Sequence, residues 1–421
     1  MELSRRNFGK LAVATGVVAA TGTGVGTALS RSADAASTWK TTGTAVSALA
    51  GFDNQMKTFM QARGITGGQL AVTYKGRLVL ARGYSTSTAL TVQPTSLFRI
   101  ASLTKSFTAA AIMKLVQDGK LSLSSPVGNI IPITPPAGQT KDTRWSAVTI
   151  KRLLQHLGGF DRDISGDPEW EDAKISKALG VPMELYPADV IKYMAGQKLD
   201  FAPGSKYVYS NFGYTLAGRV IEKVSGLSYP TYVQQKLLTP LGITRMAQGW
   251  SIAEHTGEVP YESQYSGPTV LDMSGKVVPA PYGTFSMRIQ DANGGWIASA
   301  PDLVRWAKMF DKSSSVLNTA SLNAIWAKPE IGVNSDGWYY GLGWQIRPTT
   351  GGTGRNTWHT GSMPGTFTIM VRTYNGMSWA ALFNRRDDPS GKSYGDIDAA
   401  LWTAANGVKT WPTNDLFPTY F

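Results

Sequence analysis

The chain contains no cysteine and only three histidines among its 421 residues. The missing thiols exclude disulfides, a thiol nucleophile and a lipid-modified N-terminal cysteine. The histidines, His156, His255 and His359, are too few and too scattered to suggest a zinc site.

Long hydrophobic runs are also missing after residue 35, so no later segment is predicted to cross a bilayer. Before it, Ser4-Arg-Arg-Asn-Phe-Gly-Lys10 matches a twin-arginine export signal, a mildly apolar stretch follows, and Ala33-Asp-Ala35 resembles a cleavage site. We expect residues 1–35 to be removed and the mature protein to be periplasmic or secreted. The alternative, an uncleaved membrane anchor, is weakened by the glycines and threonines of the apolar stretch.

Acidic residues are scarce relative to basic ones, 29 against 41, which gives a formal net charge of +12. The basic residues are dispersed, whereas nucleic-acid binding requires clusters with interleaved aromatics, so we expect no nucleic-acid partner. Attraction to an anionic cell wall is compatible with this charge. Cleavage leaves 386 of the 421 residues, enough for one large domain, residues 36–421.

Hydrophobic patterning predicts strands at both ends of this domain. Residues 69–84 alternate around Lys75-Gly76, and residues 365–385 alternate around Asn375-Gly376, so each predicts a β-hairpin. Helical patterns cover residues 103–118 and 396–409, and a helix-rich middle occupies roughly residues 120–295. We predict an α/β fold of the α+β type, with an antiparallel sheet built from N- and C-terminal segments, flanking helices and an inserted, mainly helical lobe.

Ser102-Leu-Thr-Lys105 lies where the helix of residues 103–118 begins, so the amine is expected one turn from the hydroxyl on the same side. A serine is a poor nucleophile until a base takes its proton, and a lysine is that base only if burial lowers its pKa. Alone the pattern is weak: a second copy occurs at Ser37-Thr-Trp-Lys40, and a helix cap followed by a surface lysine explains either copy.

Two further motifs follow in the chain. Tyr209-Ser-Asn211 precedes a helix, and offers a phenol that can move a proton and an amide that can hold a lysine or a substrate carbonyl. His-Thr-Gly occurs twice, at His255 and at His359-Thr360-Gly361. The second copy immediately precedes the C-terminal hairpin, where a rigid strand can present backbone N–H groups to a substrate oxygen, so we favour it.

In this order the three motifs resemble the serine β-lactamase and penicillin-recognising enzyme superfamily, especially its class C branch and the exported D-alanyl-D-alanine carboxypeptidases. Leu153-Leu-Gln-His156 with Gly158-Gly159, and Tyr340-Gly-Leu-Gly-Trp344, are similar landmarks, and the resemblance covers roughly residues 50–410. It implies a β-lactamase/transpeptidase-like fold and no metal or organic cofactor.

The resemblance also implies roles for the site residues. Ser102 would form an acyl-enzyme, while Lys105 and Tyr209, supported by His359, would share the proton transfers; which of the two takes the first proton is open. Asn211 would orient the substrate amide. The oxyanion would be bound by the backbone N–H groups of Ser102 and Ser362, beside Thr360 and Gly361.

One departure narrows the expected substrate. Class C β-lactamases usually have lysine where this chain has His359, and histidine is largely neutral at pH 7. A histidine at this position of the motif resembles the carboxypeptidases, D-aminopeptidases and some esterases of the superfamily. Arg347 or Arg355 is a candidate for binding a substrate carboxylate instead, although a surface arginine explains each equally well.

The leading hypothesis is an exported serine hydrolase, most concretely a D-alanyl-D-alanine carboxypeptidase or a related D-amino-acid peptidase or amidase. The alternatives are an esterase of the same fold, a β-lactamase, and a non-catalytic penicillin-binding sensor. The acyl group, the leaving group and the oligomeric state stay open.

Overall fold

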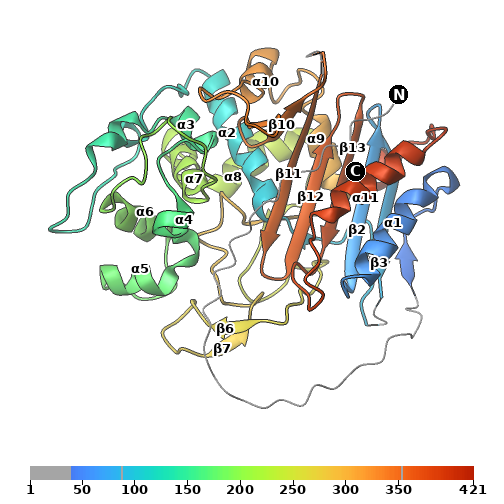
Figure 1. Cartoon of the computed structure of the whole chain (residues 1–421), viewed down its shortest axis with the longest axis horizontal. Helices are drawn as coiled ribbons and strands as arrows, with labels where there is room; N and C mark the ends of the chain where they lie inside the picture. The colour runs from blue at the N-terminus through green and yellow to red at the C-terminus, as the bar shows by residue number, and fades with distance from the viewer. Residues whose placement is uncertain (1–38, 87–88, 352–353) are drawn as a thin grey trace.

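The protein, a computed structural model that describes residues 39–86, 89–351 and 354–421, is built on an eight-stranded antiparallel sheet with the strand order β1-β3-β2-β13-β12-β11-β10-β9 (Figure 1). Its strands are β1 Lys40–Thr42, β2 Gly67–Tyr74, β3 Arg77–Ser85, β9 Tyr339–Tyr340, β10 Gln345–Pro348, β11 Arg355–Met363, β12 Thr366–Arg372 and β13 Met377–Phe383. Because β2 pairs with β13, the two ends of the chain share one sheet, which confirms the predicted architecture. The expected export signal lies outside the described residues.

Both predicted hairpins are confirmed, and turn chemistry explains them. Lys75 and Gly76, between β2 and β3, have φ values of +47° and +76°, the left-handed backbone that tight hairpin turns require. Gly376, between β12 and β13, has φ of +83°. The two turns are joined, since the Lys75 N–H donates to the Gly376 carbonyl at 2.7 Å.

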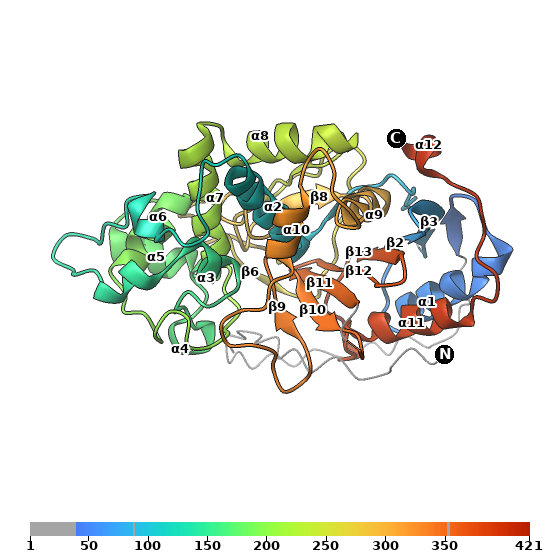
Figure 2. The same ribbon diagram turned by 90° about the horizontal axis from the view of Figure 1, so that it is seen from above.

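Helices cover both faces of the sheet (Figure 2). On one face, α1 Ala50–Gln61 and α11 Asp396–Gly407 bury a separate apolar cluster against the strands. On the other, α2 Thr104–Gln117 and α9 Ala300–Lys308 belong to the larger core. Helix α2 is buried nearly all round, as expected of a central helix, and it matches the helix predicted at residues 103–118.

The helical lobe lies to one side of the sheet (Figure 1). Its helices are α3 Ile150–Leu154, α4 Arg162–Ser165, α5 Asp172–Leu179, α6 Pro187–Ala195, α7 Phe212–Ser225 and α8 Tyr229–Val233. The remaining elements are the strands β4 Phe98–Arg99, β5 Ala247–Gln248, β6 Ser266–Pro268, β7 Val277–Pro279 and β8 Trp296–Ala298, and the helices α10 Thr319–Ile325 and α12 Phe417–Tyr420. Within the described ranges, no helix has the length and hydropathy needed to span a bilayer.

The sheet and α11 enclose an aspartate whose charge is costly. Asp398 is 4% exposed, and burial raises its pKa from 3.8 to about 7, opposed by the nearby Arg347 guanidinium. An unfolded aspartate titrates near pH 3.9. The folded state therefore holds a proton between about pH 4 and pH 7 that the unfolded state has lost.

Stability should consequently fall as pH rises through this window. The contribution of the neutral carboxyl is complete below pH 4 and is lost as pH rises through 7. We predict that Asp398→Asn, which stays neutral, is more stable than the parent by on the order of 4 kcal/mol at pH 8 and by much less at pH 4.5. Urea unfolding at both pH values measures this, with exposed Asp336→Asn as the control; an equal effect of Asp398→Asn at both would contradict it.

Candidate active site

Ser102 lies in a short helical turn, Ala101–Leu103, that leads directly into α2. The turn is strained, because Ala101 has φ of +47°, a left-handed value that is costly for a residue with a Cβ. Strand β12 holds it in place: the Thr368 hydroxyl donates to the Ile100 carbonyl at 2.9 Å, and the Thr366 hydroxyl donates to the Arg99 carbonyl at 2.9 Å. The serine is therefore mounted on the sheet rather than on a free loop.

Lys105 is fully buried beside this serine. Its Nζ lies 3.0 Å from Ser102 Oγ, 2.8 Å from Asn211 Oδ1 and 2.8 Å from the Asn293 carbonyl oxygen. Burial lowers the lysine pKa well below its usual value. The two asparagine oxygens can only accept, so each takes one N–H bond of the amine; in the neutral form of the amine, the lone pair is then left for the serine hydroxyl.

Two acids, half-buried Asp167 and buried Glu169, hold these asparagines. Asp167 Oδ2 accepts from Asn211 Nδ2 at 2.6 Å. Glu169 accepts from the Thr215 hydroxyl at 2.7 Å, and Thr215 Oγ1 accepts from Asn293 Nδ2 at 3.2 Å. Burial raises the pKa of both acids. These contacts hold Asn211 and Asn293 in place, so that the Asn211 Oδ1 and the Asn293 backbone carbonyl oxygen face Lys105. This supporting network was not predicted from the sequence.

Tyr209 is half-buried on the other side of the pair. Its ring centroid is 4.9 Å from Lys105 Nζ. Burial raises the tyrosine pKa, while a hydrogen bond with Ser102 opposes this shift. The phenol is accordingly protonated at neutral pH, and it is a proton donor next to the serine oxygen.

His156 positions this tyrosine. Its Nδ1 accepts from the Ser210 backbone N–H at 3.1 Å, its carbonyl accepts from the Val208 N–H at 3.0 Å, and its ring centroid is 4.4 Å from that of Tyr209. His156 has φ of +60°, which lets backbone and side chain contact the same segment. From the sequence, His156 was only a landmark of the family resemblance, and the two glycines at 158 and 159 were the signal of an unusual turn.

The third motif lies on β11, as expected of a rigid strand. Trp358 packs in the cluster under α1 and α11, so the next residue, His359, faces the opposite side of the sheet. A Cβ on Gly361 would stand 2.2 Å from the Ile100 carbonyl oxygen and 3.1 Å from the Ala101 Cβ. Glycine is needed there because β11 lies directly against the turn that carries the serine, and Thr360 and Ser362 flank that contact.

His359 has partners of its own. Its Nδ1 is 2.7 Å from the Thr360 carbonyl, which can only accept, so the ring proton is on Nδ1 and Nε2 accepts from the Tyr340 hydroxyl at 2.8 Å. Burial, reinforced by Lys105, lowers the His359 pKa to about 3. The imidazole is neutral at pH 7. In the described structure neither ring nitrogen is hydrogen-bonded to Ser102 or Tyr209, and a catalytic role for His359 stays a prediction.

The two arginines named from the sequence lie elsewhere. The Arg347 guanidinium is 5.4 Å from the Trp358 ring centroid, on the α11 face, and Arg355 is 5.5 Å from that of Trp326. His255, of the other His-Thr-Gly copy, stacks on Trp250 with ring centroids 3.8 Å apart.

Arg162 was missed by sequence reasoning and lies at the site. Its guanidinium carbon is 5.3 Å from the Tyr209 ring centroid, and its charge contributes to the lowered pKa of Lys105. It is half-buried, and among the described residues no hydrogen bond or ion pair engages its guanidinium. Asp161 before it is anchored, because its N–H donates to Asp200 at 2.7 Å and its carboxylate pairs with Lys206 at 2.8 Å.

Half-buried Ser102 and buried Lys105 lie beside Tyr209, between an antiparallel sheet and a helical lobe, an arrangement like that of the serine penicillin-recognising proteins. The family model described as Beta-lactamase matches residues 52–401, and the chain belongs to this family.

Individual proteins agree with this assignment. Protein flp of Staphylococcus aureus (strain N315) is 28% identical over 291 residues, which cover 66% of this chain and 53% of that protein. The chain thus spans about half the length of this curated relative. The octameric penicillin-binding protein homologue from Pyrococcus abyssi superposes with a TM-score of 0.62 at 27% identity, covering 86% of this chain and 79% of that one. The D-amino acid amidase from Ochrobactrum anthropi SV3, in complex with L-phenylalanine amide, has the same fold, with a TM-score of 0.64 at 22% identity over 85% of this chain and 98% of that one.

Proposed function

We propose that the protein is a serine hydrolase that forms an acyl-enzyme at Ser102 and cleaves D-amino-acid peptides, most concretely as a D-alanyl-D-alanine carboxypeptidase. The observation that carries the proposal is the fully buried Lys105 amine 3.0 Å from Ser102 Oγ. A neutral lysine at that distance is a general base for the hydroxyl.

Acylation begins with transfer of the Ser102 proton to Lys105 while Oγ attacks the substrate carbonyl carbon. Lys105 takes this first proton because its pKa is lowered, whereas Tyr209, with a raised pKa, is a phenol with no basic site. The oxyanion is bound by the N–H groups of Ser102 and Ser362. Tyr209 then gives its proton to the leaving nitrogen, and the C–N bond breaks.

Deacylation returns both protons. The tyrosinate is a strong base, since the pKa of Tyr209 is raised, and the adjacent Lys105 ammonium stabilises it. It takes a proton from water as the oxygen attacks the acyl carbon. Lys105 returns its proton to Ser102 Oγ when the ester bond breaks, and the site regains its starting state.

We predict that Ser102→Ala abolishes covalent labelling by a fluorescent penicillin, and that Lys105→Ala and Tyr209→Phe each lower turnover at least about a hundredfold. Turnover of the parent should fall about tenfold per pH unit below the lowered pKa of Lys105, because protonation removes the base. Turnover of a D-Ala-D-Ala peptide over a pH series measures both effects. Lys114→Ala, on the same helix, and exposed Tyr186→Phe are the controls. Full activity of Ser102→Ala would refute the proposal.

A carboxypeptidase must bind the substrate's terminal carboxylate, and Arg162 fits this task. Neutral His359 offers no positive charge, whereas the Arg162 guanidinium lies over the Tyr209 ring and makes no hydrogen bond or ion pair among the described residues. A guanidinium binds a carboxylate through two parallel N–H bonds. The terminal carboxylate of a substrate whose leaving group lies near Tyr209 is therefore close to Arg162.

We predict that Arg162→Ala raises KM for a D-Ala-D-Ala peptide by about ten- to a hundredfold, in line with a lost charged hydrogen bond. KM for the same peptide with an amidated C-terminus should change less than about threefold. Arg162→Lys should recover part of the loss, and Arg355→Ala is the matched control. Equal losses on both peptides would show that Arg162 holds the site together instead of binding the carboxylate.

A second candidate is an amidase that acts on a D-amino-acid amide with a free amino group. Asp167 favours it, since this half-buried carboxylate contacts Asn211 at 2.6 Å and offers a partner for an ammonium. The peptide pair above distinguishes the two, because an amidase would prefer the amidated form. Cleavage of p-nitrophenyl butyrate would indicate the esterase, and cleavage of a chromogenic cephalosporin the β-lactamase.

We also propose that the protein is exported by the twin-arginine route. The supporting observation is the sequence of residues 4–35. We predict that Arg5→Lys together with Arg6→Lys retains the full-length chain in the cytoplasm, while the parent appears outside it with an N-terminus near Ala36. Fractionation with N-terminal mass spectrometry measures this, and export of the double variant would contradict it.

A further inference from the structure

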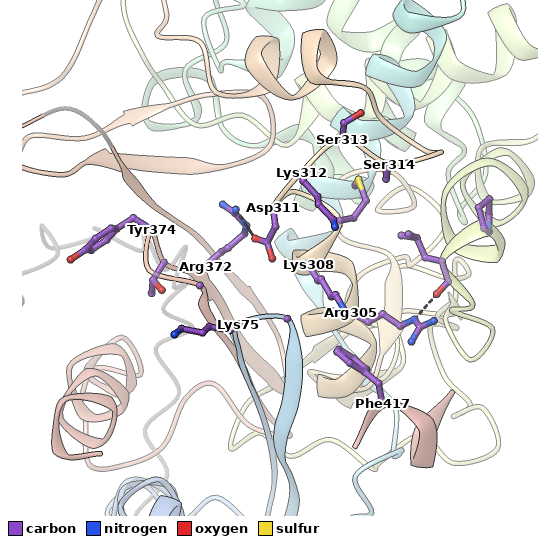
Figure 3. Close-up of a pocket in the computed structure, with 16 residues that line it drawn as sticks. Lys75, Arg305, Lys308, Asp311, Lys312, Ser313, Ser314, Arg372, Tyr374 and Phe417 are labelled. Carbon is purple, nitrogen blue, oxygen red and sulfur yellow. Dashed lines mark hydrogen bonds and ion pairs between the residues drawn. The ribbon is translucent and has the colours of Figure 1, made fainter. Parts of the chain in front are cut away.

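A positively charged recess lies away from the serine site (Figure 3). Its volume is about 720 Å³, and its charged lining comprises Lys75, Arg305, Lys308, Lys312, Arg372 and a single acid, Asp311. The net charge of this lining is +4. The charges come from separate elements: the β2–β3 turn, α9 and the loop after it, and the end of β12.

The recess is at the far end of β12 from the nucleophile. Thr366 and Thr368 of this strand bond the backbone before Ser102, whereas Arg372 lines the recess. Four residues of a strand separate Thr368 from Arg372, about 13 Å. A ligand in the recess is thus remote from the reacting atoms.

The arginines of the recess already have partners. Arg372 pairs with Asp311, with Nη2 2.6 Å from Oδ1, and Arg305 Nε donates to the Leu241 carbonyl. The three lysines differ: in the described parts of the chain no carboxylate pairs with Lys75, Lys308 or Lys312.

Lys308 lies against the turn that carries Lys75. A Cβ on Gly76 would stand 3.8 Å from the Lys308 ammonium, whereas the Lys75 ammonium lies over the Tyr74 ring, 5.3 Å from its centroid. Like charges gathered in a recess repel one another, and an anion relieves the repulsion. The Lys308 and Lys312 ammonium groups act as point charges that suit phosphate, and Ser313 adds a hydroxyl.

The recess continues into a second one of about 520 Å³ that shares Lys312 and Arg372 and adds Arg355. Arg372 contributes to the lowered pKa of Arg355, so the two guanidinium groups face the same region. The basic lining therefore extends over both recesses.

We propose that these joined recesses bind a phosphate-bearing chain, and that the ligand is an extended phosphodiester polymer. The inference is independent of the hydrolase chemistry. Binding forms no covalent bond, and would hold the enzyme to a polyanionic surface while Ser102 stays accessible.

Calorimetric titration of the parent protein with tripolyphosphate and with poly(glycerol phosphate) tests the proposal. We expect saturable binding that weakens at least about tenfold in Lys308→Gln/Lys312→Gln. The matched control is Lys177→Gln/Lys192→Gln, which removes the same charge from exposed lysines of the helical lobe and should bind within about twofold of the parent. Penicillin labelling should be unchanged in both.

The outcomes are distinct. Tighter binding of the polymer than of tripolyphosphate supports the extended ligand, and tighter binding of tripolyphosphate assigns the recess to a small soluble phosphate instead. Equal weakening in both double variants, or equal binding of polyglutamate, would overturn a specific phosphate site. A lack of saturable binding to either probe would do the same.

Discussion

Burial of one amine organises the candidate active site. Lys105 connects α2 to Asn211, at the start of α7, and to Asn293, in the loop before β8. Asn211 and Asn293 are 106 and 188 residues away from Lys105 in the sequence, and the amine joins all three segments at one point. An unsatisfied polar group here would be costly, so its hydrogen bonds fix how the helical lobe meets the sheet. The same burial lowers the pKa of Lys105, as a general base at this position requires.

The sheet and the lobe contribute different properties. The sheet supplies rigidity, because β12 bonds the strained turn around Ala101 and β11 approaches it closely at Gly361. The lobe carries Tyr209 and Arg162, to which we assign protonation of the leaving group and binding of the substrate carboxylate. Strain at Ala101 persists only because several elements over-determine it. A substitution of Gly361 or of Thr368 would therefore shift Ser102 through the backbone of this turn.

Local patterns were readable from the sequence, and contacts between distant segments were not. The Ser102–Lys105 pair is three residues apart on a helix, and Lys75-Gly76 identifies its hairpin by turn chemistry, so both could be predicted. The Glu169–Thr215–Asn293 series joins residues 46 and 78 positions apart. Arg347 was a candidate for binding a carboxylate, yet strand alternation places Trp358 and His359 on opposite faces, and Arg347 packs on the Trp358 side. Arg162 could be identified only from the structure, in which the start of α4 lies beside Tyr209.

Charge placement separates recognition from chemistry. His359 is neutral and Tyr209 stays protonated, so Arg162 and Asp167 are the groups that can discriminate the charge of a substrate beside the serine–lysine pair. Repulsion from Arg162 also favours the neutral form of Lys105. A bound carboxylate would cancel that repulsion and raise the pKa of Lys105. The lysine amine would then be a stronger base, and its ammonium form a weaker acid. Substrate binding would thereby tune the base at the moment when it accepts the serine proton.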